Sequence, residues 1–260
     1  MHVSPDLPRA RRTLIAERLR AGQPVVAAAL AEEFGVSEDS IRRDLRTLAQ
    51  EGLCQRVYGG ALPLSPASTP IGARLGEEAA RKHALARRAV DLIRPDQTLF
   101  LDAGSTLVPL AGLLPEGQGL RVVTNSIPAA AALLGRSGIA LVLIGGGVNM
   151  TVGGAVDAQA LSELARLRID LCFLGACALS PEEGLAGFEM DDVAFKRRLL
   201  QQSRTSVLMM TNGKLGTQAP FAIARADEIG HYILEADAPA EMELRLRRTG
   251  ATVLRAAPPA

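Results

Sequence analysis

The chain has 260 residues, with 29 Lys plus Arg against 28 Asp plus Glu, and its formal net charge is +1. Hydrophobic residues make up 48% and charged residues 22% of the chain, which excludes wholesale disorder and indicates one or two soluble globular domains. A net charge near zero gives no sign of an overall basic nucleic-acid binder. With 3% aromatic residues, stacking platforms for single-stranded nucleic acid are disfavoured.

The first sixty residues have the pattern of three short helices followed by a hairpin. Helices are predicted over 9–20, 27–34 and 38–50, and the first should bury Leu14, Ile15 and Leu19 before it ends at Gly22. The segment from Gly35 to Ser37 reads as a tight turn, in which Gly permits a positive φ and Ser37 caps the next helix. Residues 53–57, followed by two glycines, read as a short hairpin.

The third predicted helix has two contrasting faces. Ile41, Leu45 and Leu48 form an apolar stripe, and the opposite face carries Ser40, Arg42, Arg43, Arg46 and Thr47. Three helices with a glycine turn and a basic outer face describe a winged helix-turn-helix, whose third helix fits the major groove of DNA. The alternative is a small helical domain whose arginines are a solvated face. The charge of residues 1–60, 9 basic against 8 acidic, does not decide between the two.

A longer motif favours DNA binding. The run LAEEFGVSEDSIRRDLRTLAQEGLCQRVYGGA, residues 30–61, resembles the N-terminal domain of the DeoR family of bacterial transcription regulators. Ser40 replaces the usual Thr of that family, and Tyr58 stands where His is common. The resemblance implies a winged helix-turn-helix over residues 1–60. Its expected DNA-binding residues are Ser37, Ser40, Arg42, Arg43, Arg46, Thr47, Arg56 and Tyr58.

The rest of the chain alternates apolar strand-like runs with helical ones. Residues 61–76 have the Pro- and Ser-rich composition of a linker, and a helix is expected over 77–93. Strands are predicted over 98–102, 120–124, 139–144, 169–175, 205–210, 231–234 and 251–254, and helices over 105–114, 127–134, 156–167, 191–203 and 239–248. This alternation predicts an α/β domain over 77–260 with a largely parallel sheet covered on both faces.

Three predicted strands end in small polar residues. Gly104, Ser105 and Thr106 follow the first strand at an expected helix start, where amides and hydroxyls suit an anion such as phosphate. Thr124, Asn125 and Ser126 end the second strand, and three glycines from Gly145 end the third. Each group alone also has a turn explanation, but together they indicate a small anionic ligand. The absence of a strand–GxGxxG–helix disfavours a dinucleotide fold.

These strand ends carry a second resemblance, to the DeoR effector-binding domain. Leu101–Thr106, Val123–Ser126, Gly145-Gly146 and Asp170–Gly175 match in order, and the resemblance implies a fold similar to ribose-phosphate isomerases and CoA transferases. All three lysines of a chain with 26 arginines also fall at family lysine positions. Lys82 is expected on the surface, solvated or in a salt bridge. The expected effector-binding residues are Asp102, Gly104, Ser105, Thr106, Thr124, Asn125, Ser126, Gly145, Gly146, Lys196 and Lys214.

Three positions depart from the family pattern. Thr211 stands where an acidic residue usually precedes the late lysine, Glu235 ends a segment that usually reads Ile-Thr-Asp, and residues 176–179 lack the expected glycine. A pocket is still expected, but its ligand contacts are expected to be altered or weaker than is usual in the family.

The leading hypothesis is a transcription regulator, most simply a repressor of a sugar or carbon-metabolism operon. It would bind operator DNA as a dimer or tetramer and be released by a phosphorylated sugar. The alternative is a sugar-phosphate isomerase-like enzyme fused to a DNA-binding module, for which Asp102, Glu189 and Glu235 are the only carboxylates expected near strand ends. No cofactor, metal site or membrane segment is predicted, and three unpaired cysteines suit a reducing cytoplasm.

Overall fold

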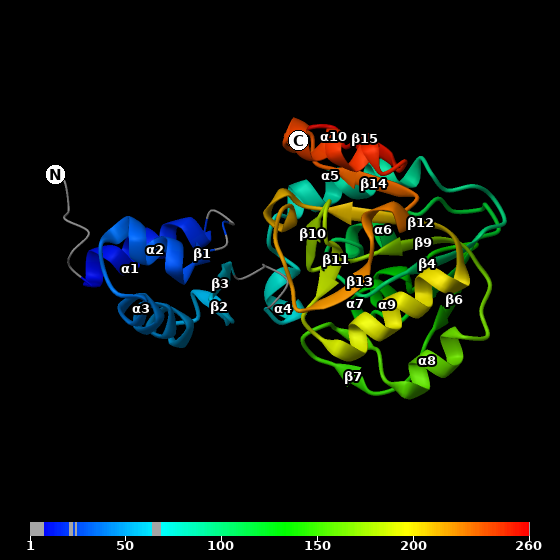
Figure 1. Cartoon of the computed structure of the whole chain (residues 1–260). Helices are drawn as coiled ribbons and strands as arrows, with labels where there is room; N and C mark the ends of the chain where they lie inside the picture. The colour runs from blue at the N-terminus through cyan, green and yellow to red at the C-terminus, as the bar shows by residue number, and fades with distance from the viewer. Residues whose placement is uncertain (1–7, 21–22, 24, 64–68, 260) are drawn as a thin grey trace. The chain divides into compact units, whose positions relative to one another are not determined.

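The computed structural model describes residues 8–20, 23, 25–63 and 69–259 (Figure 1). The chain divides into two compact units, residues 1–66 with 216–218, and residues 67–215 with 219–260. The predicted helix end at Gly22 and residues 64–68 of the predicted linker lie outside the described residues. Two parts of that linker have regular structure. Residues 61–63 belong to a strand of the first unit, and Ile71–Arg74 form a helical turn of the second.

The first unit contains the three predicted helices and a small sheet. These elements are α1 (Pro8–Arg20), β1 (Val25–Val26), α2 (Ala27–Phe34), α3 (Glu38–Gln50), β2 (Cys54–Val57) and β3 (Gly60–Pro63). The strands pair in the order β1-β3-β2, all antiparallel. The sequence reading missed β1, which has only two residues and therefore no detectable alternation.

The core of this unit comes from the predicted stripes, with one exception. Ile15, Leu19, Leu30, Ile41, Leu45 and Leu48 are buried together. Leu14, expected to be buried, is 39% exposed, because residues one apart on a helix point about 100° away from each other. At Gly60 a Cβ would lie 2.0 Å from the Val25 carbonyl oxygen, so only glycine lets β3 pair with β1 at this point.

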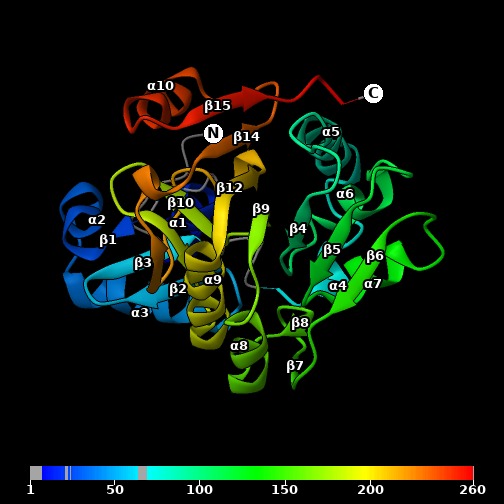
Figure 2. The same ribbon diagram turned by 90° about the vertical axis from the view of Figure 1, so that its right-hand side faces the viewer.

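The second unit is built on a seven-stranded sheet in which every neighbouring pair is parallel (Figure 2). The order is β15-β14-β12-β9-β4-β5-β6, so the chain starts in the middle of the sheet and winds outward in both directions. The strands are β4 (Thr98–Leu101), β5 (Arg121–Thr124), β6 (Ala140–Leu143), β9 (Ile169–Leu174), β12 (Ser203–Met210), β14 (His231–Leu234) and β15 (Thr252–Arg255). The prediction of a largely parallel α/β sheet is confirmed.

Helices cover both faces of this sheet. Alternate strand residues such as Leu99 and Phe173 pack against α5 (Ala79–Val90), α6 (Val108–Leu113) and α7 (Ile127–Leu133). Their neighbours Phe100 and Cys172 face α8 (Ala158–Leu164), α9 (Met190–Gln202) and α10 (Ala240–Arg248). Alternation along each strand thus supplies two separate cores, as expected for a parallel sheet covered on both faces.

Several short elements lie at the carboxyl ends of the strands. They are α4 (Ile71–Arg74), the hairpin of β7 (Val148–Asn149) and β8 (Gly154–Ala155), and the antiparallel sheet of β10 (Ala178–Ser180), β11 (Gly184–Gly187) and β13 (Phe221–Ala224). Two 3₁₀ turns cover Asn212–Lys214 and Ala226–Glu228. The sequence reading predicted none of these elements, because two to four residues carry too little periodicity.

Candidate DNA-binding surface and anion cavity

Helix α3 presents the basic face predicted from the sequence. Arg42, Arg43 and Arg46 are exposed, while Ile41, Leu45 and Leu48 are fully buried on the other side of the helix. Arg42 pairs with Glu38 at 2.7 Å, and the Arg43 side chain donates to the backbone oxygen of Asp39 at 3.2 Å. Both contacts are local to the exposed face of α3.

The two serines of the predicted site have a structural role at the start of α3. The Ser37 Oγ accepts from the backbone N–H of Ser40 at 3.3 Å, and the two hydroxyl oxygens are 3.0 Å apart. Gly35, with φ of 64°, ends α2 in the left-handed conformation expected from the turn motif. Ser37 and Ser40 therefore hold the turn that sets the position of α3.

The hairpin and one buried ion pair complete this unit. Arg56 and Tyr58 are exposed on β2 and at its turn, where a wing is expected. Asp44, within the Arg-Arg-Asp motif, is only 4% exposed and accepts from the Arg11 Nε at 2.6 Å. Asp44 thus joins α3 to α1, and the motif mixes surface arginines with an aspartate that holds the fold together.

In the second unit, a cavity of about 40 Å³ lies beside the carboxyl ends of β4 and β9. Asp102, Gly104 and Thr106 follow β4, and Lys196 comes from α9. The cavity is lined by Arg74, Ala103, Gly104, Thr106, Thr151, Val152, Gly175, Ala176, Cys177, Phe188, Glu189, Asp192, Lys196 and Lys214. Its volume suits one small group of a ligand rather than an entire sugar.

Lys196 is the centre of a buried charge cluster. Its Nζ lies 2.5 Å from Asp192 Oδ1 and 3.0 Å from Asp102 Oδ2, and all three side chains are at most 5% exposed. Burial alone would lower the pKa of Lys196, but Asp102 and Asp192 outweigh it and the pKa is raised. Burial raises the pKa of Asp102 to about 6, against the pull of Lys196. Lys196 is therefore a charged ammonium that neutralises these carboxylates.

Lys214 has a different electrostatic setting. Burial lowers its pKa to about 8, and the positive charges of Arg74 and Lys82 act in the same direction. The family's acidic residue three positions earlier is Thr211 here, which is fully buried and brings no negative charge. Cys177 and Glu78 act in the opposite direction, so Lys214 is a buried cation with charges of both signs nearby, and an added anion would raise its pKa.

Lys82 was expected on the surface, and that expectation is wrong. It is 3% exposed, and its Nζ donates to the backbone oxygen of Arg74 at 2.6 Å. The helical position of Lys82 gave no sign of burial, because the element that covers it, α4, falls in a segment read as linker. Its pKa is lowered by burial.

The predicted strand-end residues only partly come together. Asp102, Gly104, Thr106, Lys196 and Lys214 lie in or beside the cavity, whereas Ser105 is buried nearby without lining it. The helix expected to begin at Ser105 begins at Val108, because residues 104–107 form a turn. No helix therefore starts at Ser105, as the predicted anion site required. Gly104 and Thr106 of this turn line the cavity instead.

The polar residues after β5 are committed to internal contacts. The Thr124 hydroxyl donates to the Leu101 oxygen at 2.6 Å, and the Asn125 amide donates to the Ala155 oxygen at 3.1 Å. The Ser126 hydroxyl accepts from the Ala129 N–H at 3.3 Å and caps α7. Thr124, Asn125 and Ser126 thus serve the turn after β5, which was the alternative to ligand binding. None of the three lines the cavity.

The glycines after β6 are also outside the cavity. Gly145 and Gly146 are exposed, and the next residue, Gly147, donates its N–H to Asp157 Oδ2 at 2.7 Å. Asp157 caps α8, and the backbone N–H groups around it lower its pKa. A carboxylate of the chain itself therefore occupies the place that the sequence reading gave to a ligand anion.

Arg74 and Asp192 line the cavity but were not singled out from the sequence. Arg74 lies in the predicted linker and is one of 26 arginines, and Asp192 was given no role beyond its place in the helix predicted over 191–203. Their contribution depends on contacts between elements far apart in the chain, which no local pattern reports.

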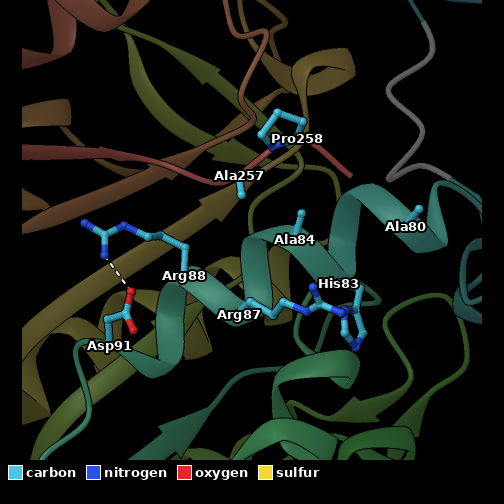
Figure 3. A pocket seen from close by; sticks show the side chains of 8 residues that line it. All are labelled: Ala80, His83, Ala84, Arg87, Arg88, Asp91, Ala257 and Pro258. Atoms are coloured by element: carbon cyan, nitrogen blue, oxygen red, sulfur yellow. Dashed lines mark hydrogen bonds and ion pairs between the residues drawn. The ribbon is translucent and has the colours of Figure 1, made fainter. Parts of the chain in front are cut away.

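A second hollow of about 430 Å³ lies along α5 beside the C-terminal residues Ala257 and Pro258 (Figure 3). It is open and contains none of the predicted site residues. Its Arg88 pairs with Asp91 at 2.6 Å, as Figure 3 shows, and Arg87 is exposed. Exposed side chains around an open hollow are weaker indications of a ligand than buried cations.

Comparisons with known proteins agree with this layout. A family model described as DeoR-like helix-turn-helix domain matches residues 11–67, and one described as DeoR C terminal sensor domain matches residues 77–236. The chain belongs to the DeoR family. Within the described residues, no helix has both the length and the apolar character needed to cross a membrane, and no group of three or more metal-ligating side chains is present.

Curated relatives of this DeoR-family chain match over most of its length. The glycerol-3-phosphate regulon repressor of Escherichia coli (strain K12) is 33% identical over 191 residues, 73% of this chain and 76% of that protein. The HTH-type transcriptional regulator GlpR of Haloferax volcanii is 30% identical over 250 residues, 95% and 98% of the two chains. Ribose 5-phosphate isomerase A from Methanocaldococcus jannaschii superposes with a TM-score of 0.40 at 18% identity, covering 54% and 55% of the two chains.

Proposed function

We propose that this protein is a transcriptional repressor of a sugar or carbon-metabolism operon, released from operator DNA by a small phosphorylated metabolite. The observation that carries the proposal is the exposed basic face of α3, in a chain whose second unit buries Arg74, Lys196 and Lys214 around one cavity. The first feature suits duplex DNA, and the second suits an anionic group. We place the boundary between the two domains within residues 64–68.

The ligand class follows from the cavity. The cavity is lined by Arg74, Lys196 and Lys214 and by the carboxylates of Glu189 and Asp192. Asp102, Glu77 and Glu78 also act on these cations, so the support for an anionic ligand is the set of buried guanidinium and ammonium donors and not a net charge. A small cavity lined by three buried cationic side chains suits a compact anion. A relative named for a glycerol-3-phosphate regulon makes a phosphorylated polyol or sugar the first class to test.

An isomerase-like activity receives no comparable support. Among the described residues, Asp102 accepts from Gly175 and Lys196, Glu235 accepts from Arg81 at 2.5 Å, and Glu189 accepts from Asn149 at 3.3 Å. Asp102 Oδ1 and Glu235 Oε1 are buried without a hydrogen-bond partner, but the other oxygen of each carboxylate is paired with Lys196 or Arg81, and neither residue lines the cavity. We therefore propose a binding protein, and turnover of ribose 5-phosphate by the purified chain would contradict this.

The proposal is tested by the salt dependence of duplex binding. Full-length protein, given duplexes selected from a random-sequence library, should bind one sequence preferentially, with an affinity that falls steeply as salt increases, because phosphate contacts release counterions. A two-fold repeat in the selected sequence would support binding as a dimer or higher oligomer. If no duplex is enriched, and binding does not change with salt, the proposed function fails.

A further inference from the structure

Helix α4 is the first described element of the second unit, directly after the segment that joins it to the DNA-binding unit. It lies between the two matched family segments, which end at residue 67 and resume at residue 77. Ile71 donates its N–H to the Thr151 oxygen at 3.0 Å, and both Ile71 and Arg74 are less than one-tenth exposed. A four-residue turn read as linker is therefore built into the domain.

Arg74 carries an unsatisfied donor into the cavity. Its Nη2 donates to the Thr151 oxygen at 2.7 Å, but its Nε is buried and has no hydrogen-bond partner. A buried N–H without an acceptor is costly, and a phosphate or carboxylate would supply the acceptor in the geometry that a guanidinium prefers. Burial lowers the pKa of Arg74, although the charges of Asp192 and Glu77 act in the opposite direction.

A second unsatisfied group faces the same space. Thr106 is 1% exposed, lines the cavity, and its hydroxyl oxygen has no hydrogen-bond partner. A guanidinium N–H and a hydroxyl that both lack partners, in a cavity that also contains Lys214, match the donors needed by a single small anion.

The β7–β8 hairpin connects α4 with the strand ends. Thr151 and Val152 line the cavity, and a Cβ at Gly153 would lie 2.6 Å from Ile71 Cγ2, so the hairpin is packed tightly against α4. Gly154 is equally close to Asn125 at the end of β5. On the other side, Lys82 of α5 holds the Arg74 carbonyl. The position of α4 thus depends on the same contacts that shape the cavity.

We propose that Arg74 binds the anionic group of a ligand in this cavity and, because α4 carries it, transmits occupancy of the cavity to the segment leading to the DNA-binding unit. This inference rests on the proposed function for its biological meaning. Binding gives the Arg74 Nε its missing acceptor and fixes α4 against the hairpin. The bound ligand therefore makes α4 more rigid than it is in the ligand-free protein. Allosteric release requires such a difference between the ligand-bound and ligand-free states.

The test is hydrogen exchange on the full-length protein with inorganic phosphate or glycerol 3-phosphate, and with glycerol as the uncharged control. Both anions, but not glycerol, should slow exchange of the α4 amides, including those of Ala73 and Leu75, which donate within this turn. This wild-type result decides the matter even if a variant fails to fold. Unchanged exchange in α4, or no binding of either anion, overturns the inference.

Variants locate the effect. Arg74→Gln should weaken binding of both anions by at least about tenfold and abolish the slowing in α4, whereas Arg74→Lys should retain part of both. Thr106→Val, which removes only the unpaired hydroxyl, should weaken binding less. Arg87→Gln is the matched control, since Arg87 is exposed and lies in the separate hollow of Figure 3. Equal anion affinity of Arg74→Gln and wild type contradicts the inference.

Duplex binding by the same preparations separates the two proposals. Arg74→Gln should still bind the selected duplex but resist release by glycerol 3-phosphate. If no preparation binds DNA while the anions still slow exchange in α4, the proposed function fails and the contact made by Arg74 stands.

Discussion

Lys196 shows how a residue picked from the sequence as a ligand contact acquires another role in the fold. Its ammonium lies between Asp102 and Asp192, with the three side chains almost completely buried. The sequence indicated the position because lysine is rare in this chain, but gave no sign of Asp192 as its partner. A cation held by two carboxylates shapes the cavity, which leaves Arg74 and Lys214 as the better positioned cations for a ligand.

Lys196→Met should destabilise the protein by about 3–5 kcal/mol at pH 7, because it leaves two buried carboxylates without their cation. Asp102, whose pKa burial already raises, would lose the cation that lowers it, so this carboxyl stays protonated in the folded state to higher pH than in the unfolded chain. The penalty is present above that pKa and shrinks as the pH falls through it. Urea unfolding at pH 7 and pH 5 measures both effects.

Arg166→Gln, on an exposed residue, is the control for this experiment. If Lys196→Met lowers the free energy of unfolding by less than about 1 kcal/mol, its effect is that of an ordinary surface substitution. That result would contradict the role of Lys196 as the cation of a buried charge cluster.

Lys214 should make anion binding depend on pH. Its pKa is lowered to about 8, so the ammonium is present below pH 8 and is lost as the pH rises through that value. Sulfate is a suitable probe because its charge is constant over this range. Its affinity should fall by about tenfold or more between pH 7 and pH 9.5, since one charge-assisted hydrogen bond disappears.

Calorimetric titration with sulfate measures this change. Lys214→Met should bind sulfate weakly at both pH values, with a flat profile. A wild-type profile that is equally flat would mean that Lys214 does not contact the anion.

At the scale of elements, α3 was predicted to its boundaries because its signals are local. The Ser37 cap, the acidic first turn and the spacing of Ile41, Leu45 and Leu48 all lie within one helix. The seven main strands were predicted for the same reason, with ends displaced by one or two residues. The start of α6, the β7–β8 hairpin and α4 were missed, because the contacts that fix them come from elsewhere in the chain.

Within α3, the arginines should differ in their effect on DNA binding. Arg43→Ala should weaken binding to the selected duplex by about 1–3 kcal/mol if it contacts a base, or lower the salt slope by about one if it contacts phosphate. Arg42→Ala should cost less, because Arg42 is paired with Glu38 at 2.7 Å and must leave that contact to bind DNA. Fluorescence anisotropy over a salt series measures both. An Arg42→Ala loss equal to that of Arg43→Ala would contradict this ranking.

At the scale of the molecule, net charge is a poor guide to function. The value of +1 averages a helix-turn-helix unit, in which three arginines lie on the exposed face of α3, with a sensor unit whose lysines are all buried. The sequence correctly predicted the α/β class and the DeoR family. It could not predict which of the three polar strand ends lines the cavity, because Thr124, Asn125 and Ser126 differ from Thr106 only in their packing.

The central claim is that an anion in the sensor unit controls DNA binding by the other unit. The most direct measurement is anisotropy of a labelled, selected duplex bound to the full-length protein, titrated with glycerol 3-phosphate and a panel of sugar phosphates, with the unphosphorylated compounds as controls. At least one phosphorylated compound should release the duplex, and its unphosphorylated counterpart should not. Binding that no compound in the panel alters, or release by phosphorylated and unphosphorylated forms alike, would contradict the claim.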